Sequence, residues 1–195
     1  IMKISNPIYK ELINLKIINK NKIIKIFDQT RDKKIPVYKD QKSEVIFLEK
    51  SITDIKYYEA VKYKNKNAFS NIKTSKGRIV VPKLEDDQRR ALQFQKFLKN
   101  KTVLDFGCGW GGFLSKLKNI KSASGVELRN ECLKHIKKNL KKISVTNNIT
   151  NFNKKFDVIT LFHILEHIPH QVETLRILKK KLFKKGKIII EVPSA

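Results

Sequence analysis

Residues 102–114, TVLDFGCGWGGFL, constrain the fold of this chain more than any other stretch. A short apolar run leads to an acid, Asp105, and then to four glycines within six residues. An amphipathic pattern, with Phe113, Leu114 and Leu117, follows at once. This order predicts a strand, a tight turn and the start of a helix, because glycine adopts backbone conformations that other residues avoid. Such a turn brings backbone amides and a helix N-terminus close to a bound ligand.

Strand and helix patterns alternate from residue 101 to the end of the chain. The strong apolar run at 156–161 is continuous, as in a buried parallel strand. The final predicted helix is followed by two lysines and Gly186, a typical C-terminal cap. Repeated βα units of this kind predict an α/β fold with a Rossmann-like, doubly wound parallel sheet. The predicted strands are 102–106, 122–128, 143–149, 156–161 and 187–192, and the predicted helices are 111–119, 131–142 and 172–183.

The first hundred residues have a different organisation. Residues 1–50 are predicted to form a small α+β extension, with a helix at 7–18 and short antiparallel strands at 23–27, 36–38 and 45–48. Residues 51–100 read as a helical lid or linker, in which a tyrosine-rich helix at 53–71 either packs on the main domain or covers a ligand. A second helix at 84–100 carries three acids in its first turn. Its expected apolar face consists of Ala91, Leu92, Phe94, Phe97 and Leu98.

Composition narrows the possible partners. No apolar run approaches the ~20 residues of a membrane span, and no secretory signal opens the chain, so we predict a cytoplasmic protein. The net charge is +25, but only six of the 43 basic residues are arginine. Because arginine suits bidentate phosphate recognition, this balance favours a generally solvated basic surface over a nucleic-acid patch. Cys108 and Cys132 lack the spacing of a zinc site or a disulfide framework, and we expect no metal.

Polar residues follow the predicted strands where a doubly wound sheet binds its ligands. Glu127 lies 20 residues after Gly107, where a carboxylate can accept hydrogen bonds from both hydroxyls of a ribose. The glycines also satisfy the G-x-G-x-x-G fingerprint, which leaves a nicotinamide dinucleotide possible. Asp105, two residues before the first glycine, would repel a pyrophosphate, whereas a cationic ligand with ammonium and sulfonium groups would gain from it.

From about residue 85 onward the chain resembles the class I S-adenosylmethionine-dependent methyltransferases. Residues 105–111 match the first motif of that family, and residues 125–128 resemble the second. Residues 156–159 with 163–169 resemble the fourth-strand signature of small-molecule and sugar-modifying members related to ubiquinone-biosynthesis enzymes. Residues 178–193 resemble the family's helix, glycine and fifth strand.

The resemblance implies S-adenosyl-L-methionine as cofactor and S-adenosyl-L-homocysteine as product. The backbone at 107–109 would approach the methionine moiety, Glu127 would hold the ribose and Leu128 would pack on the adenine. Asn148 stands where the family usually has an acid that contacts the adenine amino group. The expected cofactor-binding residues are Asp105, Gly107, Cys108, Gly109, Gly111, Glu127, Leu128, Asn148, Phe162 and His163.

Two histidines are candidates for catalysis. A general base is needed only if the methyl acceptor is a hydroxyl or an acidic carbon, and histidine titrates near neutrality. His163 and His167 both follow the fourth strand, although Glu166 and His167 could instead brace the following helix.

The resemblance favours O- or C-methylation of a small molecule or glycan precursor, because residues 161–164 lack the [DN]-P-P-[YF] sequence typical of enzymes that methylate nucleic-acid amines. An RNA methyltransferase and a non-catalytic cofactor-binding domain stay open as alternatives. The family sheet has seven strands, whereas Ala195 comes just after the fifth. We therefore expect residues 101–195 to be a domain truncated by two strands, or a dimer or partner to cover the exposed edge.

Overall fold

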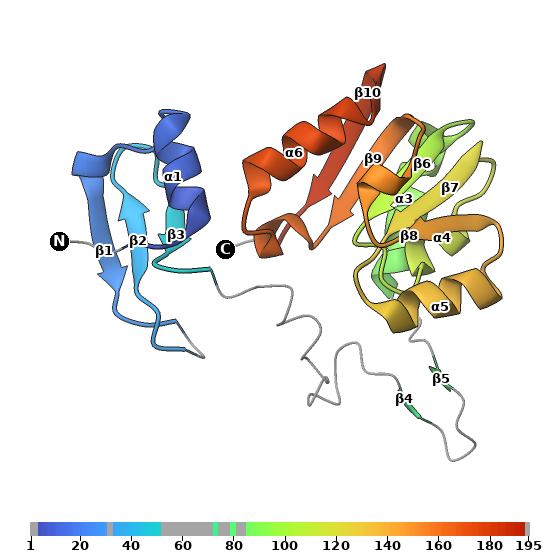
Figure 1. Ribbon diagram of the computed structural model, residues 1–195, viewed down its shortest axis with the longest axis horizontal. Coiled ribbons are helices and arrows are strands. Elements are labelled where there is room, and N and C mark those ends of the chain that lie inside the picture. Colours follow the sequence, from blue (N-terminus) through green and yellow to red (C-terminus); the bar gives the residue numbers. More distant parts are fainter. Residues whose placement is uncertain (1–3, 31–32, 52–71, 74–78, 81–84, 194–195) are drawn as a thin grey trace. The chain divides into compact units, whose positions relative to one another are not determined.

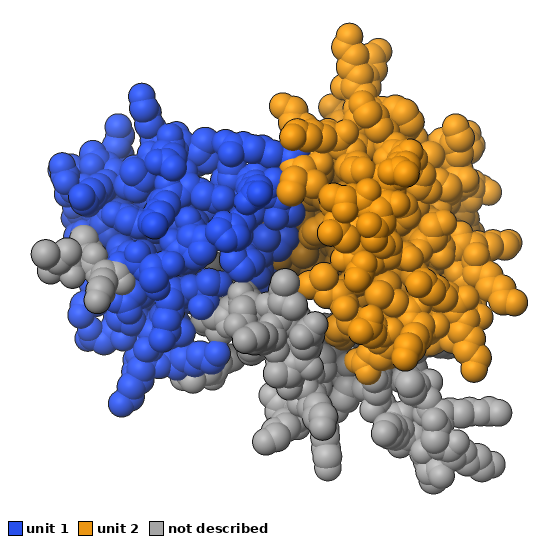
Figure 2. Space-filling model, in the orientation of Figure 1, with its two compact units in different colours: residues 1–56, 167–176 blue, residues 57–166, 177–195 orange. Residues whose placement is uncertain are grey.

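The computed structural model describes residues 4–30, 33–51, 72–73, 79–80 and 85–193. For residues 72–73 and 79–80 it describes the backbone alone. The chain divides into two compact units (Figure 2). Unit 1 comprises residues 1–56 and 167–176, and unit 2 comprises residues 57–166 and 177–195. The helix predicted at 53–71 lies outside the described residues. None of the helices in the described ranges is long and apolar enough to cross a membrane.

Unit 2 is built on a five-stranded sheet with the strand order β10-β9-β6-β7-β8 (Figure 1). Every neighbouring pair is parallel, and β6 is the central strand. The chain places β7 and β8 on one side of β6 and then crosses to place β9 and β10 on the other, which confirms the predicted doubly wound α/β fold. The strands are β6 (Thr102–Phe106), β7 (Ser122–Val126), β8 (Ile143–Thr146), β9 (Phe156–Phe162) and β10 (Leu182–Glu191). The helices α3 (Glu85–Leu98), α4 (Gly112–Lys116) and α5 (Asn130–Asn139) belong to the same unit, whereas α6 (Gln171–Lys180) begins in unit 1 and ends in unit 2.

The core of unit 2 lies around β6 and β9. Val103, Leu104, Val158 and Ile159 on these strands are almost completely excluded from solvent, as expected for central parallel strands covered on both faces. The start of β6 is tied to β9 by Asp157. One oxygen of its carboxylate accepts hydrogen bonds from the backbone N–H and the hydroxyl of Thr102, each at 2.8 Å.

The C-terminal part of unit 2 differs from the prediction. Helix α6 ends at Lys180, not at residue 183, and β10 already begins at Leu182. Gly186 is therefore not a helix cap but lies within β10, between the pairs Leu182↔Phe156 and Lys187↔Val158. Five steps along β10 correspond to two along β9, so this part of the strand is irregular. Pairing with β9 prevails here over the local signal of two lysines and a glycine.

Unit 1 contains an antiparallel sheet with the order β1-β2-β3, as predicted. Helix α1 begins at Pro7, where the Asn6 side chain accepts a hydrogen bond from a first-turn amide. Tyr9 of α1 contacts Phe47 of the sheet, with ring centroids 5.6 Å apart. The elements of unit 1 include α1 (Pro7–Asn14), a 3-10 turn at Lys20–Lys22, β1 (Ile23–Phe27), β2 (Val37–Asp40) and β3 (Ile46–Leu48). Unit 2 also contains the antiparallel pair β4 (Ile72–Lys73) and β5 (Ile79–Val80).

Asp40 organises the turn between β2 and β3. Its carboxylate is inaccessible to solvent and accepts hydrogen bonds from the backbone N–H groups of Ser43, at 2.7 Å, and Asn19, at 3.0 Å. These bonds, that of Ser43 foremost, lower the pKa of Asp40 to about 2. The ionised carboxylate therefore holds this end of the small sheet together.

Candidate functional site

The glycine turn after β6 is held by bonds to the neighbouring strand. Gly107, Gly109 and Gly111 all have positive φ angles, of 85°, 53° and 77°. The N–H groups of Gly107 and Cys108 both donate to the Val126 carbonyl at the end of β7, at 2.8 and 3.0 Å. A Cβ atom on Gly107 would overlap the side chain of Ile164, which follows β9. The turn, the end of β7 and the loop after β9 therefore pack together.

Glu127 directly follows β7 and is buried. Its Oε2 accepts the Gly109 N–H at 2.8 Å, and its Oε1 accepts the Arg129 N–H at 3.0 Å and the Arg129 Nε at 3.2 Å. The carboxylate thus joins the glycine turn to the start of α5. Next to it, the Leu128 side chain is 50% exposed, so an apolar surface lies beside the carboxylate.

Asp105 lies below the turn. It is buried within β6, and its Oδ1 accepts a 2.6 Å hydrogen bond from the Thr160 hydroxyl of β9. Burial raises the pKa of Asp105 to about 7, although the bond from Thr160 acts in the opposite direction. At neutral pH, Asp105 therefore carries less negative charge than an acid at this position was expected to carry. A contact between Asp105 and a ligand stays a prediction.

Three other expected binding residues have structural contacts of their own. The Cys108 thiol is buried beside Gly125, where a Cβ atom would meet it, and burial raises its pKa. Gly111 caps the N-terminus of α4 in a left-handed conformation. Asn148 Oδ1 accepts from the backbone N–H and the hydroxyl of Thr150, at 3.0 and 2.9 Å, at the start of the 3-10 turn Ile149–Asn151.

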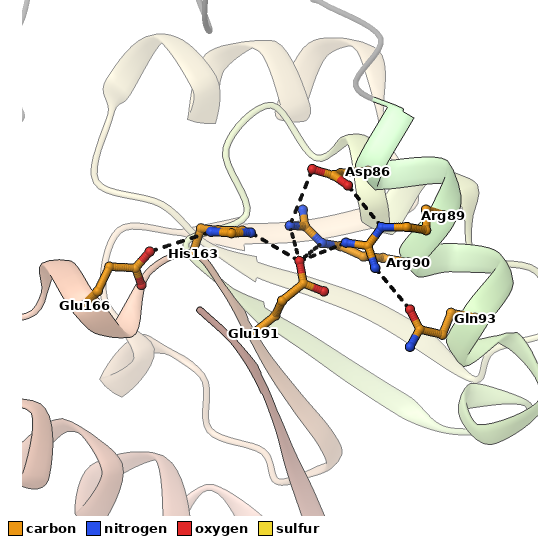
Figure 3. A network of polar contacts seen from close by, with 7 residues as sticks. All are labelled: Asp86, Arg89, Arg90, Gln93, His163, Glu166 and Glu191. Atoms are coloured by element: carbon orange, nitrogen blue, oxygen red, sulfur yellow. Dashed lines mark hydrogen bonds and ion pairs between the residues drawn. The ribbon is translucent and has the colours of Figure 1, made fainter. Parts of the chain in front are cut away.

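Phe162 and His163 lie at the end of β9, beside the glycine turn. Phe162 is buried, with its ring edge-to-face against Phe113 at 5.0 Å. The His163 imidazole lies between two carboxylates: Nε2 is 3.2 Å from Glu191 Oε1, and Nδ1 is 3.7 Å from Glu166 Oε1 (Figure 3).

His167, the other catalytic candidate, closes the 3-10 turn Leu165–His167 and is exposed. It belongs to unit 1, whereas His163 belongs to unit 2. Only His163 is therefore placed with the glycine turn in one compact unit.

The buried face of α3 differs from the prediction. Leu92 and Phe97, both on the expected apolar face, are 61% and 46% exposed, whereas Arg90 is buried. The Arg90 guanidinium donates to Glu191 Oε1 through two nitrogens, at 2.6 and 3.0 Å, and lies 4.8 Å from the centre of the Phe162 ring. One sequence signal could have placed Arg90 on the buried face. Arg90 precedes Phe94 by four residues, so the two side chains share a face of the helix.

Asp87 was also not expected near the turn. Its carboxylate occupies the space that a side chain on Gly112 would need, and burial raises its pKa. The carboxyl groups of Asp87 and Glu127 therefore lie beside the turn, with Asp105 beneath it. Within the described residues, no group of three or more histidine, cysteine, aspartate or glutamate side chains could hold a metal ion.

Part of this chain is similar in sequence to known proteins. The ubiquinone biosynthesis O-methyltransferase of Saccharomyces cerevisiae (strain ATCC 204508 / S288c) is 36% identical over 87 residues, which cover 38% of this chain and 28% of the yeast protein. The tRNA U34 carboxymethyltransferase of Campylobacter fetus subsp. fetus (strain 82-40) is 32% identical over 104 residues, 48% of this chain and 37% of that protein. The chain thus spans well under half the length of these relatives.

The solved structures that are similar to this chain include an S-adenosylmethionine-dependent methyltransferase from Clostridium acetobutylicum. Its sequence is 21% identical, and the match has a TM-score of 0.47 and covers 56% of this chain and 49% of that one. A family model described as "Methyltransferase domain" matches residues 82–195, more than half of the chain. The matched range contains the whole five-stranded sheet and the glycine turn with Glu127. The chain therefore belongs to the methyltransferase domain family.

Proposed function

We propose that this chain is an S-adenosylmethionine-dependent methyltransferase that transfers a methyl group to a hydroxyl or carbon of a small molecule or glycan precursor. The observation that carries the proposal is the 2.8 Å hydrogen bond from the Gly109 N–H to Glu127 Oε2. It makes the glycine turn and the expected ribose-binding acid a single structural unit. Family membership supports the reaction class, and the ubiquinone O-methyltransferase relative supports a small acceptor.

The residues around the turn fit the cofactor chemically. Glu127 would accept hydrogen bonds from the ribose hydroxyls, and the exposed Leu128 side chain would cover the adenine. The backbone at 107–109 would line the methionine end, where the neighbouring carboxylate of Glu127 suits positive charge better than a pyrophosphate. When bound, the cofactor supplies an electrophilic methyl group. The protein's share of the reaction is then to hold and orient the acceptor.

Calorimetric titration with S-adenosylmethionine and with NAD tests the cofactor. We expect the wild type to bind S-adenosylmethionine and not NAD. Glu127→Ala should weaken binding at least about tenfold, because hydrogen bonds to a charged group contribute roughly 1.5–3 kcal/mol each. Glu173→Ala removes an exposed glutamate of α6 and serves as the matched control. Tight binding of NAD, or equal affinity in both variants, would overturn the proposal, and thermal melts verify that each variant is folded.

RNA methylation is the second candidate function. The net charge of +25 and the relative that carries the name tRNA U34 carboxymethyltransferase favour it. Filter binding of tRNA between about 50 and 200 mM salt discriminates RNA methylation from methylation of a small molecule. An RNA-binding protein neutralises several phosphates, so its affinity for tRNA should fall by about 10³ or more over that range. A non-catalytic domain would bind the cofactor without ever releasing S-adenosylhomocysteine. The cytoplasmic location and a partner at the sheet edge stay predictions.

A further inference from the structure

One carboxylate oxygen, Glu191 Oε1, contacts three basic side chains (Figure 3). Arg90 reaches it at 2.6 and 3.0 Å, Arg89 at 2.9 Å and His163 Nε2 at 3.2 Å. Burial by itself would raise the pKa of Glu191, but the hydrogen bonds from Arg90 and Arg89 prevail and lower it to about 2. Glu191 is therefore a carboxylate at every pH at which the protein would work, and it can only accept hydrogen bonds.

The backbone connects His163 to Glu191 a second time. Glu191 ends β10 directly opposite Phe162, and the His163 N–H donates to the Glu191 carbonyl at 2.8 Å. His163 itself has a φ angle of +53°, which is unfavourable for a residue with a side chain. Strained residues of this kind persist where the surroundings over-determine them, and they cluster at functional sites. The backbone of His163 is therefore held at the end of β10 by its pairing with Glu191.

The geometry also determines which nitrogen carries the proton. Because Glu191 can only accept, Nε2 must donate, and the neutral ring then has its lone pair on Nδ1. Nδ1 lies 3.7 Å from Glu166 Oε1, beyond hydrogen-bonding distance. The His163 side chain is 41% exposed, so a ligand group can reach it. The next residue, Ile164, packs against Gly107 of the glycine turn.

The same cluster could be considered as a binding site for an anionic acceptor. Its charges argue against this reading. Arg90 and Arg89 are already paired with Glu191, and Arg89 Nε also donates to Asp86 Oδ1 at 3.0 Å. A negatively charged acceptor would have to compete with both carboxylates and would face Glu166 on the other side of His163. The cluster orients the imidazole and does not attract an anion.

We propose that Glu191 is a positioning residue that holds His163 in its Nε2–H tautomer, so that Nδ1 accepts the proton of a hydroxyl group on the methyl acceptor. The inference rests on the proposed methyltransferase function and narrows its acceptor to a neutral hydroxyl compound. The O–H bond breaks, and its electron pair stays on the oxygen for the new bond to the methyl carbon. The bond between that carbon and the sulfur of the cofactor would break at the same time, with its electron pair left on the sulfur of S-adenosylhomocysteine. The proton forms a bond to Nδ1 before passing to water. An amine with a free lone pair would need no such base.

The carboxylates around His163 suit the charged state of the ring. When Nδ1 gains a proton, the positive imidazolium faces Glu166 and Glu191. Two guanidinium groups already offset the charge of Glu191, so its main contribution is orientation. Removing Glu191 should therefore disturb the tautomer more than removing the negative charge of Glu166.

The tautomer can be measured by NMR on the ¹⁵N-labelled protein without cofactor, about two pH units above the ordinary histidine pKa of about 6.5. The chain has four histidines, and the signals that disappear in His163→Gln are those of His163. We expect Nε2 of His163 to be protonated and Nδ1 bare in the wild type. In Glu191→Ala the two nitrogen shifts should move toward each other, as the tautomers mix. Glu191→Gln should keep the wild-type shifts, because an amide oxygen also accepts, and Glu166→Gln is the matched control.

Two results would overturn the inference: a protonated Nδ1 in the neutral wild-type ring, or a folded Glu191→Ala variant with wild-type shifts. If Glu191→Ala does not fold, because Arg90 is left buried without its partner, the wild-type tautomer and the Glu191→Gln spectrum still decide. The readout needs no cofactor. A failed tautomer test with intact S-adenosylmethionine binding removes only the role of Glu191, whereas absent binding with the expected tautomer removes the proposed function.

Discussion

Replacing Gly107 by alanine tests how tightly the glycine turn is constrained. The new Cβ would overlap the side chain of Ile164, and a φ angle of +85° is unfavourable for alanine. Gly109→Ala separates the two effects. Gly109 also has a positive φ angle, of 53°, but its Cβ would have only an ordinary contact, at 3.5 Å from the Arg129 guanidinium.

The expected losses follow from these contacts. A left-handed conformation costs alanine roughly 1–2 kcal/mol, and overpacking adds about 1–3 kcal/mol. Gly107→Ala should therefore lower the free energy of unfolding by about 2–5 kcal/mol, and Gly109→Ala by about 1–2 kcal/mol. Urea unfolding gives both values. Trp110 is the sole tryptophan of the chain and is buried next to the turn, so its fluorescence reports on this region.

A double variant completes the test. Ile164→Ala removes the overlapping side chain, so the double variant Gly107→Ala/Ile164→Ala should be more stable than the sum of the two single losses by about 1–3 kcal/mol, the overpacking contribution. Equal losses at Gly107 and Gly109, or additive effects of Gly107→Ala and Ile164→Ala, would refute the packing of the turn against the loop after β9.

Three aspartates give further predictions. The pKa of Asp40 is lowered from 3.8 to about 2, so the stability that it confers is complete above pH 3.8 and is lost as the pH falls toward 2. Asp40→Asn should abolish this acid dependence in circular-dichroism titrations, and an unchanged titration curve would contradict it. The pKa of Asp105 is raised to about 7, so the folded state retains a proton that the unfolded state releases, and stability should fall as the pH rises from about 4 to 7. Urea midpoints across that range should show a smaller decline for Asp105→Asn, and an equal decline would count against this assignment. Asp157→Ala leaves the backbone N–H and the hydroxyl of Thr102 without their acceptor and should cost about 1–3 kcal/mol in urea unfolding, whereas a loss below about 0.5 kcal/mol would disprove it.

The strands of unit 2 could be predicted because their signals are local. The apolar run at 156–161 and the glycine turn after 102–106 each specify one element through neighbouring residues, and the parallel topology follows from their alternation. Glu127 could be placed next to the turn for the same reason, since parallel strands bring their carboxyl ends to one edge of the sheet.

The errors concern contacts between residues that are distant in sequence. Arg90 is buried because Glu191, about a hundred residues later, accepts its hydrogen bonds. Helical periodicity of apolar residues does not predict a buried arginine, so the expected apolar face includes Leu92, which is exposed, and omits Arg90. At the end of α6, the residues before Gly186 match a helix terminus, but pairing with Phe156 draws Leu182 into the sheet. In both cases a tertiary partner outweighed local propensity.

The irregular pairing in β10 marks a place where the chain can tolerate a change of length. Residues 187–191 pair one for one with residues 158–162, and these pairs alone place Glu191 opposite Phe162. A residue inserted between Leu182 and Lys187 can be accommodated in the stretch without regular partners. The same insertion after Lys187 would turn Glu191 to the other face of the sheet and separate it from His163. A peptide tag or spectroscopic label is therefore best introduced at residues 183–186, because residues 187–191 then keep their pairing with β9 and Glu191 stays beside His163.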